Sequence, residues 1–257
     1  MPASTPRLVA FDLDDTLTPS KSPISPDMAQ ALAELLAVVP VCIISGGQLE
    51  QFTTQVTDRL DLDDDARSRL HLMPTCGTRY YRFTGGGLEQ VYAHDLTPQE
   101  RADATTAVEE QARRLGLWED ETWGPVLEDR GSQITFSALG QRAPLDAKRA
   151  WDPTGEKKER LRAAVAPLLP GLEVRSGGST SVDITRKGVD KAYGMTRLAE
   201  HTGIDLADML FVGDRLDDGG NDYPVKALGV PCVAVAGAEE TPDVVRRIVA
   251  DITAATA

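Results

Sequence analysis

A short apolar segment that runs directly into a group of carboxylates constrains this chain more than any other feature. Leu8 to Phe11 is apolar, and Asp12, Asp14 and Asp15 follow it. Valine and phenylalanine favour a buried strand, whereas crowded carboxylates repel one another unless a cation or a shared proton offsets their charge. Ligands of open α/β sheets bind at the carboxyl ends of strands. The segment therefore predicts a core strand whose end carries chemistry.

Composition excludes several classes of partner. The chain has 257 residues, 41% of them apolar, enough for one large domain or for a core with a smaller inserted domain. No apolar run approaches the roughly 20 residues that span a bilayer, and residues 1–7 lack the pattern of a signal peptide, so we expect a cytoplasmic protein without a membrane partner. A net charge of −13 argues against nucleic acid.

Both ends of the chain alternate apolar strands with helices. This order predicts right-handed βαβ units and an α/β fold with a parallel sheet. Strands are expected at 8–11, 39–44, 71–75, 209–212 and 230–235, and helices at 25–38, 48–59, 188–201, 223–228 and from Thr241 onward.

The middle of the chain has a different pattern, with two β-like runs around Gly85 at 78–92 and helices at 97–115 and 155–169. Strands are expected at 133–138, 171–175 and 181–185. We therefore expect a discontinuous α/β core, residues 1–82 and 187–257, and an inserted α+β domain at 83–186.

Two of the predicted strand ends carry groups suited to phosphate. A carboxylate nucleophile at Asp12 would need a second carboxyl two residues on, such as Asp14, to protonate the leaving oxygen. The structural alternative for an isolated pair of this spacing is a turn or a helix cap. Ser45, Gly46 and Gly47 leave the second strand and enter a helix, which suits a phosphate oxygen, although such a loop is common.

Two further segments suggest charge compensation. Lys191 lies at a helix start, where the helix dipole disfavours a cation, and it would neutralise phosphate and aspartate there unless it is a solvated surface lysine. After the strand at 209–212, Asp214, Asn221 and Asp222 offer the hard oxygen ligands of a Mg²⁺ site. Each acidic segment alone could be a turn. Together they predict a shared site if their strands are neighbours.

These motifs, in this order, resemble the haloacid dehalogenase superfamily. The insert after the third strand is similar to its cap type IIB, and the segments around Gly177, Lys191 and Asp214 are similar to the eukaryotic-type phosphomannomutases and related sugar-phosphate phosphatases. The resemblance implies a Rossmann-like parallel-sheet core with an α+β cap, Mg²⁺ as cofactor, and a small sugar phosphate as substrate.

The resemblance also implies residue roles. Asp12 would be the nucleophile and Asp14 the general acid/base. Ser45 and Lys191, with Gly46, would hold the phosphoryl group. The metal ligands would be Asp12, Asp14 (through its carbonyl), Asp214, Asn221 and Asp222, and the substrate-binding residues would include Lys21, Arg130, Lys148, Ser181 and Asp183.

Departures from the mutase pattern favour hydrolysis. Lys21, Gln141 and Lys148 stand where the mutases carry arginine, although Arg142 adjoins one of them. An ammonium or amide holds a second phosphate less well than a guanidinium fork. We therefore expect a sugar-phosphate phosphatase, with phosphomannomutase as the alternative and a homodimer through the cap as possible.

Two other classes remain as alternatives. An inactive binding protein of the same fold would be expected to lack Asp12, Asp14, Lys191 or Asp214, and all four are present. A nicotinamide-dependent enzyme would carry GxGxxG after the first strand, and this chain does not.

Overall fold

The computed structural model describes residues 5–20, 22–177 and 179–256. The chain forms two compact units. One unit, here called the core unit, comprises residues 1–93 and 189–257, and the other, the cap unit, comprises 94–188. Among the residues described, the core unit has two clusters of buried apolar side chains and the cap unit has one. The sequence-predicted arrangement of a discontinuous core with an insert is therefore present.

The core unit is built on a seven-stranded sheet with the order β11-β10-β1-β2-β3-β4-β5. β1 lies between β10 and β2 and pairs in parallel with both, although β10 is far away in sequence. The parallel strands are β1 (Leu8–Phe11), β2 (Val41–Ile44), β3 (Leu70–Met73), β10 (Met209–Gly213) and β11 (Cys232–Ala234), and the antiparallel ones are β4 (Arg79–Thr84) and β5 (Gly87–Ala93).

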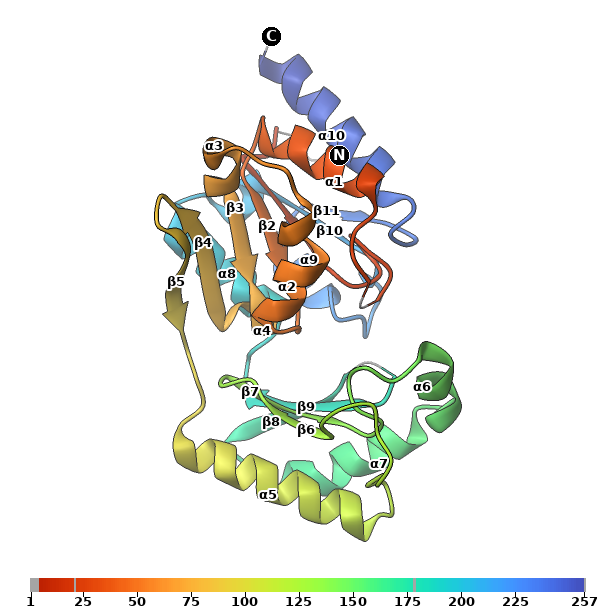
Figure 1. The fold of residues 1–257 in the computed structure, drawn as a ribbon. Helices are drawn as coiled ribbons and strands as arrows, with labels where there is room; N and C mark the ends of the chain where they lie inside the picture. The colour runs from red at the N-terminus through yellow and green to blue at the C-terminus, as the bar shows by residue number, and fades with distance from the viewer. Residues whose placement is uncertain (1–4, 21, 178, 257) are drawn as a thin grey trace. The chain divides into compact units, whose positions relative to one another are not determined.

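Helices cover both faces of this sheet (Figure 1). Successive β1 side chains point to opposite faces, so Val9 and Phe11 join one apolar cluster and Leu8 and Ala10 join another. The first cluster packs against α1 (Pro26–Leu36), α2 (Leu49–Gln55) and α10 (Thr241–Thr256), and the second against α8 (Lys191–Thr202) and α9 (Tyr223–Ala227). Burial on both faces explains the uninterrupted apolar strands.

Local signals fix where the main helices begin. The Ser25 hydroxyl accepts a hydrogen bond from the amide of Met28, and Pro26 occupies the first turn of α1. Asp190 caps α8 in the same way, by accepting from the amide of Tyr193 at 3.0 Å. Lys191 is consequently the first residue of α8, directly after the cap.

The cap unit is an antiparallel sheet with the order β6-β7-β9-β8, packed against α5 (Pro98–Arg114) and α7 (Glu156–Val165) (Figure 1). A capping box between Thr97 and Glu100 starts α5. The strands are β6 (Leu127–Asp129), β7 (Gln133–Ser137), β8 (Leu172–Ser176) and β9 (Ser181–Arg186), and a short helix, α6, spans Leu145–Trp151. The expected α+β insert is therefore present.

The predicted domain boundary at 82/83 differs from the boundary in the structure. β4 pairs with β3, and β5 continues the same sheet, so the hairpin belongs to the core unit and the cap unit begins at His94. The return boundary lies at 188/189 rather than 186/187. The hairpin pattern is local, whereas its sheet partner is set by long-range pairing.

The remaining elements are short. β6, α3 (Asp64–Ser68), α4 (Pro74–Gly77) and α6 have no counterpart in the expectations from sequence, and the strand expected at 230–235 is shortened to β11. Short 3-10 helices lie at Thr57–Arg59, Ala166–Leu168 and Leu206–Asp208. Within the residues described, no helix combines the length and apolar character that crossing a membrane requires.

Candidate active site

The carboxyl ends of β1 and β10 bring three carboxylates together in the core unit. Asp12 follows β1, and its amide donates to the carbonyl of Val212 in β10 at 3.0 Å. Asp214 follows β10, and Asp222 lies eight residues further on. One carboxylate oxygen from each of Asp12, Asp214 and Asp222 lies within 4.8 Å of the others. The two acidic segments therefore form one cluster, as their strand positions predict.

Lys191 is the cation at this cluster. Its Nζ lies 2.6 Å from Oδ1 of Asp12 and 2.5 Å from Oδ1 of Asp222. The lysine side chain is only 2% exposed, so the ion pairs are buried. A solvated surface lysine, the alternative considered from sequence, is thereby excluded.

Burial and charge together set the proton affinities here. Burial raises the pKa of Asp12 to about 7, with Lys191 opposing the shift and Asp222 adding to it. Burial also raises the pKa of Asp214, and the neighbouring Asp222 raises it further. For Lys191, burial lowers the pKa, but the carboxylates of Asp12 and Asp222 outweigh burial and raise it overall. One ammonium thus faces three carboxylates.

This excess of negative charge fits a divalent cation. Hard cations such as Mg²⁺ prefer carboxylate oxygens, and Asp12, Asp214 and Asp222 supply them from a buried or half-buried site. The donor set contains no histidine or thiolate. The chemistry of the residues therefore agrees with the metal that the sequence resemblance implies.

The loop after β10 holds Asp222 in place. The amide of Arg215 donates to Oδ2 of Asp222 at 3.0 Å, and Lys191 holds the other oxygen. A Cβ at Gly213 would lie 2.4 Å from Oδ2 of Asp222, and one at Gly220 would lie 2.0 Å from the carbonyl oxygen of Arg215. Asn221, a predicted metal ligand, is exposed in the same loop.

The loop after β1 has a compact shape that the sequence does not indicate. Asp15 adopts a left-handed backbone with a φ of 64°. Its amide donates to the carbonyl of Thr18, and its Oδ1 accepts from the amide of Ser20 at 3.1 Å. Aspartate tolerates this conformation because its short side chain bonds locally. Asp15 therefore closes the loop that carries Asp14, which is half-buried beside it.

Thr16 is a site contact that the sequence reasoning missed. Its hydroxyl donates to Oδ1 of Asp214 at 3.2 Å, and its carbonyl accepts from the hydroxyl of Thr241 at 2.6 Å. Thr16 is fully buried. The sequence could have predicted this contact, because a threonine four residues after the aspartate at the end of a strand lies in the same loop as that aspartate.

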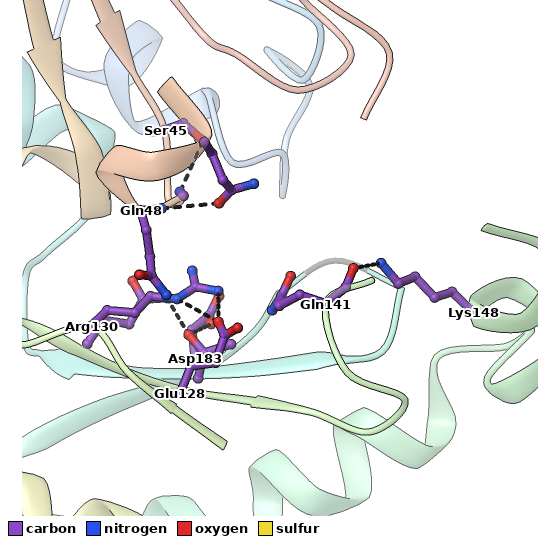
Figure 2. Close-up of polar contacts among 11 residues, drawn as sticks. Ser45, Gln48, Glu128, Arg130, Gln141, Lys148 and Asp183 are labelled. Carbon is purple, nitrogen blue, oxygen red and sulfur yellow. Dashed lines mark hydrogen bonds and ion pairs between the residues drawn. The ribbon is translucent and has the colours of Figure 1, made fainter. Parts of the chain in front are cut away.

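Ser45 begins the loop after β2, as predicted. Residues 45–47 form what is here called the serine loop. The side-chain oxygen of Ser45 accepts from the amide of Gly47 at 3.2 Å (Figure 2). The carbonyls of Ser45 and Gly47 accept from the amides of Cys76 and Thr75, both at 2.9 Å. Ser45, Gly46 and Asp12 all follow carboxyl ends of adjacent parallel strands.

In the cap unit, Arg130 is held by an acidic neighbour. Its Nη2 lies 2.6 Å from Oε2 of Glu128, and its Nε donates to the same oxygen at 3.2 Å (Figure 2). Both residues belong to the β6–β7 hairpin. Arg130 is therefore oriented by its own hairpin, and the carboxylate of Glu128 offsets its charge locally.

Asp183, another predicted substrate-binding residue of the cap unit, is held by hydrogen bonds. Its Oδ1 accepts from the hydroxyl of Thr135 at 2.8 Å, and that hydroxyl in turn accepts from Nε2 of Gln133. A Cβ at Gly177 would lie 2.6 Å from its Oδ2. Ser181 lies on the same strand, β9, two residues earlier. The sequence reasoning missed Thr135 and Gln133.

Two of the three positions at which the mutases carry arginine lie in contact with each other. Nζ of Lys148, on α6, donates to the backbone carbonyl of Gln141 at 2.8 Å (Figure 2). These positions therefore form a contact within the cap unit. The third such position, Lys21, lies outside the described residues.

Comparison with known proteins agrees with these features. The family model described as haloacid dehalogenase-like hydrolase matches residues 147–229. A probable phosphomannomutase of Caenorhabditis elegans is 26% identical over 237 residues, covering 88% of each chain. The phosphomannomutase of Schizosaccharomyces pombe is 27% identical over 228 residues, covering 85% of this chain and 84% of the relative.

Among solved structures, a haloacid dehalogenase-like hydrolase from Bacteroides thetaiotaomicron superposes with a TM-score of 0.64 at 17% sequence identity. The match covers 94% of this chain and 99% of that one. It extends the likeness of fold over both units.

Proposed function

Because this chain is a phosphotransferase of the haloacid dehalogenase superfamily, similar to phosphomannomutases, we propose that it transfers the phosphoryl group of a hexose phosphate through Asp12. The observation that carries the proposal is the buried set of Asp12, Lys191, Asp214 and Asp222 at the carboxyl ends of β1 and β10. The buried ammonium orients the carboxylate for attack on phosphorus and offsets the charge of the phosphoryl oxygens, which repel an uncompensated anion.

The covalent step divides between two aspartates. An oxygen of Asp12 forms a bond to phosphorus while the bond from phosphorus to the sugar oxygen breaks. Asp14 donates a proton to that leaving oxygen, and in the second half-reaction removes one from the acceptor hydroxyl. Asp14, two residues after the nucleophile, lies in the loop that the hydrogen bonds of Asp15 close. The aspartyl-phosphate is thus made and consumed by one pair of groups.

The other predicted residues bind charge. Lys191 and the serine loop would hold the phosphoryl oxygens, Lys191 as a cation and Ser45 and Gly46 as hydrogen-bond donors. Asp12, Asp214 and Asp222, with the carbonyl of Asp14 and with Asn221, would hold Mg²⁺, which supplies positive charge to the transferring phosphoryl group when bound. In the cap unit, Arg130, Lys148, Ser181 and Asp183, together with Lys21 of the core, would bind the sugar phosphate.

Isomerisation is the better supported outcome. The departures at Lys21, Gln141 and Lys148 favour hydrolysis on sequence grounds. However, the two relatives described above are named phosphomannomutase and probable phosphomannomutase, and they match over 85 to 88% of this chain. We therefore place phosphomannomutase, interconverting mannose 1-phosphate and mannose 6-phosphate, first.

Hydrolysis remains the second candidate on one observation. A mutase must hold a second phosphate in its cap, and at two cap positions the amide Gln141 and the ammonium Lys148 replace guanidinium groups. Lys148 Nζ is moreover bonded to the carbonyl of Gln141. Weaker retention of the bisphosphate would let water accept the phosphoryl group instead.

One incubation separates the two outcomes. The protein is mixed with mannose 1-phosphate, Mg²⁺ and catalytic hexose 1,6-bisphosphate, and mannose 6-phosphate and free phosphate are followed together. A mutase forms mannose 6-phosphate only with the bisphosphate and releases little phosphate. A phosphatase releases phosphate in proportion to substrate consumed, with or without bisphosphate.

The matched variants test the nucleophile. Asp12→Asn should abolish both products, because an amide oxygen does not attack phosphorus. Asp15→Asn keeps an acceptor for the amide of Ser20 and should retain activity. Full activity of Asp12→Asn would exclude the aspartyl-phosphate mechanism.

Two general expectations belong to this proposal. Cytoplasmic location follows from the composition argument, and dimerisation through the cap unit follows from the resemblance to mutases. Trp123, Leu145 and Leu168 are exposed apolar side chains in the cap unit, from 46% to 51% exposed. Light scattering of the wild-type protein and of a Leu145→Glu, Leu168→Glu double variant tests the dimer.

A further inference from the structure

The turn after β3, which contains the short element α4 (Pro74–Gly77), has an unusual backbone. Thr75 has a φ of 49° and Cys76 a φ of 55°, and Gly77 continues in the left-handed region at 78°. This region is uncommon for non-glycine residues, and a β-branched threonine there is an outlier. Strained backbone persists only where surrounding contacts hold it, and it is concentrated at functional sites. The contacts of the turn therefore indicate its role.

One side of the turn holds the serine loop. The amides of Thr75 and Cys76 donate to the carbonyls of Gly47 and Ser45. In a planar trans peptide the N–H points opposite to the carbonyl of the same unit. Because the Ser45 carbonyl is fixed toward the turn, the amide of Gly46 is fixed away from it. The turn thus sets the direction of a backbone donor beside Ser45.

The other side of the turn packs against α8 with no space for side chains. A Cβ on Gly77 would lie 2.5 Å from the Cα of Gly194, and a Cβ on Gly194 would lie 2.8 Å from the carbonyl oxygen of Cys76. Gly194 is three residues after Lys191 on the same helix. The turn is therefore fixed against the element that carries the buried lysine.

Two hydroxyl groups close the turn. Oγ1 of Thr75 and Oγ1 of Thr78 lie 2.6 Å apart, and the Thr78 hydroxyl also contacts the carbonyl of Thr75 at 2.8 Å. Both side chains are 2% exposed. These contacts bond the first residue of the strained segment to the residue that follows the segment and so oppose its relaxation.

We infer that Thr75 and Thr78 are positioning residues for phosphoryl transfer, which keep the left-handed turn that aligns the serine loop with Lys191. The inference rests on the proposed function in so far as the group bound there is a phosphoryl group. It adds a structural cause for the alignment: one turn, packed between the serine loop and α8, fixes the distance between donors that come from different strands and helices.

The test removes the hydroxyl and keeps the shape. Thr78→Val deletes the hydroxyl contacts to Thr75, and Thr78→Ser restores them. Thr202→Val is the matched control, since the Thr202 hydroxyl bonds to Leu198 and Ile204 at the far end of α8. Two quantities are measured on the Mg²⁺-loaded protein: the amide ¹H–¹⁵N resonance of Gly46, and the affinity for inorganic phosphate by calorimetry.

We expect Thr78→Val to move the Gly46 resonance and to weaken phosphate binding about tenfold, as the loss of a buried hydrogen bond implies. Thr78→Ser and Thr202→Val should leave both unchanged. In turnover, kcat should fall more than KM rises, because the sugar contacts are elsewhere. If Thr78→Val does not fold, Thr75→Val removes the same hydroxyl pair.

An unmoved Gly46 resonance together with wild-type phosphate affinity in Thr78→Val would overturn the inference. Failure of the proposed function gives a different result. In that case the wild-type protein itself would not bind inorganic phosphate, while the Gly46 resonance would still move in Thr78→Val, which supports the positioning role of the turn alone.

Discussion

Nζ of Lys191 lies 2.6 Å from Oδ1 of Asp12, and neither side chain is more than 4% exposed. The same nitrogen contacts Asp222, whose side chain is fully buried. Buried charges of this kind are tolerated only when they are paired, because moving a single unpaired ion from water into the protein costs several kcal/mol. The folding of the core unit and the chemistry of its site therefore depend on one ammonium group.

Lys191→Met should lower the free energy of unfolding by about 3 kcal/mol at pH 7, because it leaves buried carboxylates without their cation. Urea denaturation measures this loss, and exposed Lys187→Met is the control. The deficit should shrink as the pH falls toward about 7, because loss of Lys191, which lowers the pKa of Asp12, lets the variant take up a proton at Asp12 at a higher pH than the wild type does. Equal stability of the two variants would contradict the role of the ion pair.

Mg²⁺ should raise the melting temperature of the wild-type protein, by an amount equivalent to about 2.7 kcal/mol when the free ion is at 100 times its Kd. Asp214→Asn removes one carboxylate of the cluster and should reduce the shift at the same concentration. Asp217→Asn, in the same loop but with its side chain 59% exposed, should keep it. Identical shifts in the two variants would place the cation elsewhere.

Gly177→Ala should impair sugar recognition. The new Cβ would lie 2.6 Å from Oδ2 of Asp183, so the carboxylate must move away from the Thr135 hydroxyl. We expect KM for mannose 1-phosphate to rise about tenfold, as the loss of one charged hydrogen bond implies, with a smaller change in kcat. Gly171→Ala meets no atom within 4 Å and should behave as wild type.

His71 should make the core unit sensitive to acid. Burial, with a contribution from Arg82, lowers its pKa to about 4, and its Nδ1 lies 2.6 Å from the hydroxyl of Tyr80. The unfolded chain binds a proton at this histidine near pH 6.5 and the folded one does not, so the contribution of His71 to stability falls as pH drops from about 6.5 to 4, by up to about 3 kcal/mol. Urea denaturation at several pH values should show that the free energy of unfolding depends less steeply on pH in His71→Gln than in the wild-type protein.

The sequence predicts the fold well where the signal is local or repeated. The buried strands β1, β2 and β10 are recognisable because apolar runs end at polar loops. Lys191 is recognisable because a lysine at a helix start conflicts with the helix dipole. Its burial and its two carboxylate partners follow from the fold and are not contained in the local pattern.

Other features depend on long-range geometry. The β4–β5 hairpin has the same local pattern in either unit, and only its pairing with β3 assigns it to the core. The left-handed backbone of Thr75 runs against the preference of a β-branched residue, so no sequence rule predicts it. Likewise, the hydroxyl of Thr135 reaches Asp183 only because β7 and β9 are adjacent.

The parallel pairing of β1 with β10 also has a consequence for biosynthesis. Thr16 and Asp214, which share a hydrogen bond, are separated by 198 residues. β1 leaves the ribosome early, yet its neighbour β10 is translated only after the whole cap unit, and contacts of such large sequence separation form slowly. We expect the nascent chain to hold an incomplete sheet edge, with Asp12 exposed to water, until β10 emerges. Pulse proteolysis of stalled chains ending before and after Gly213 would show this late step.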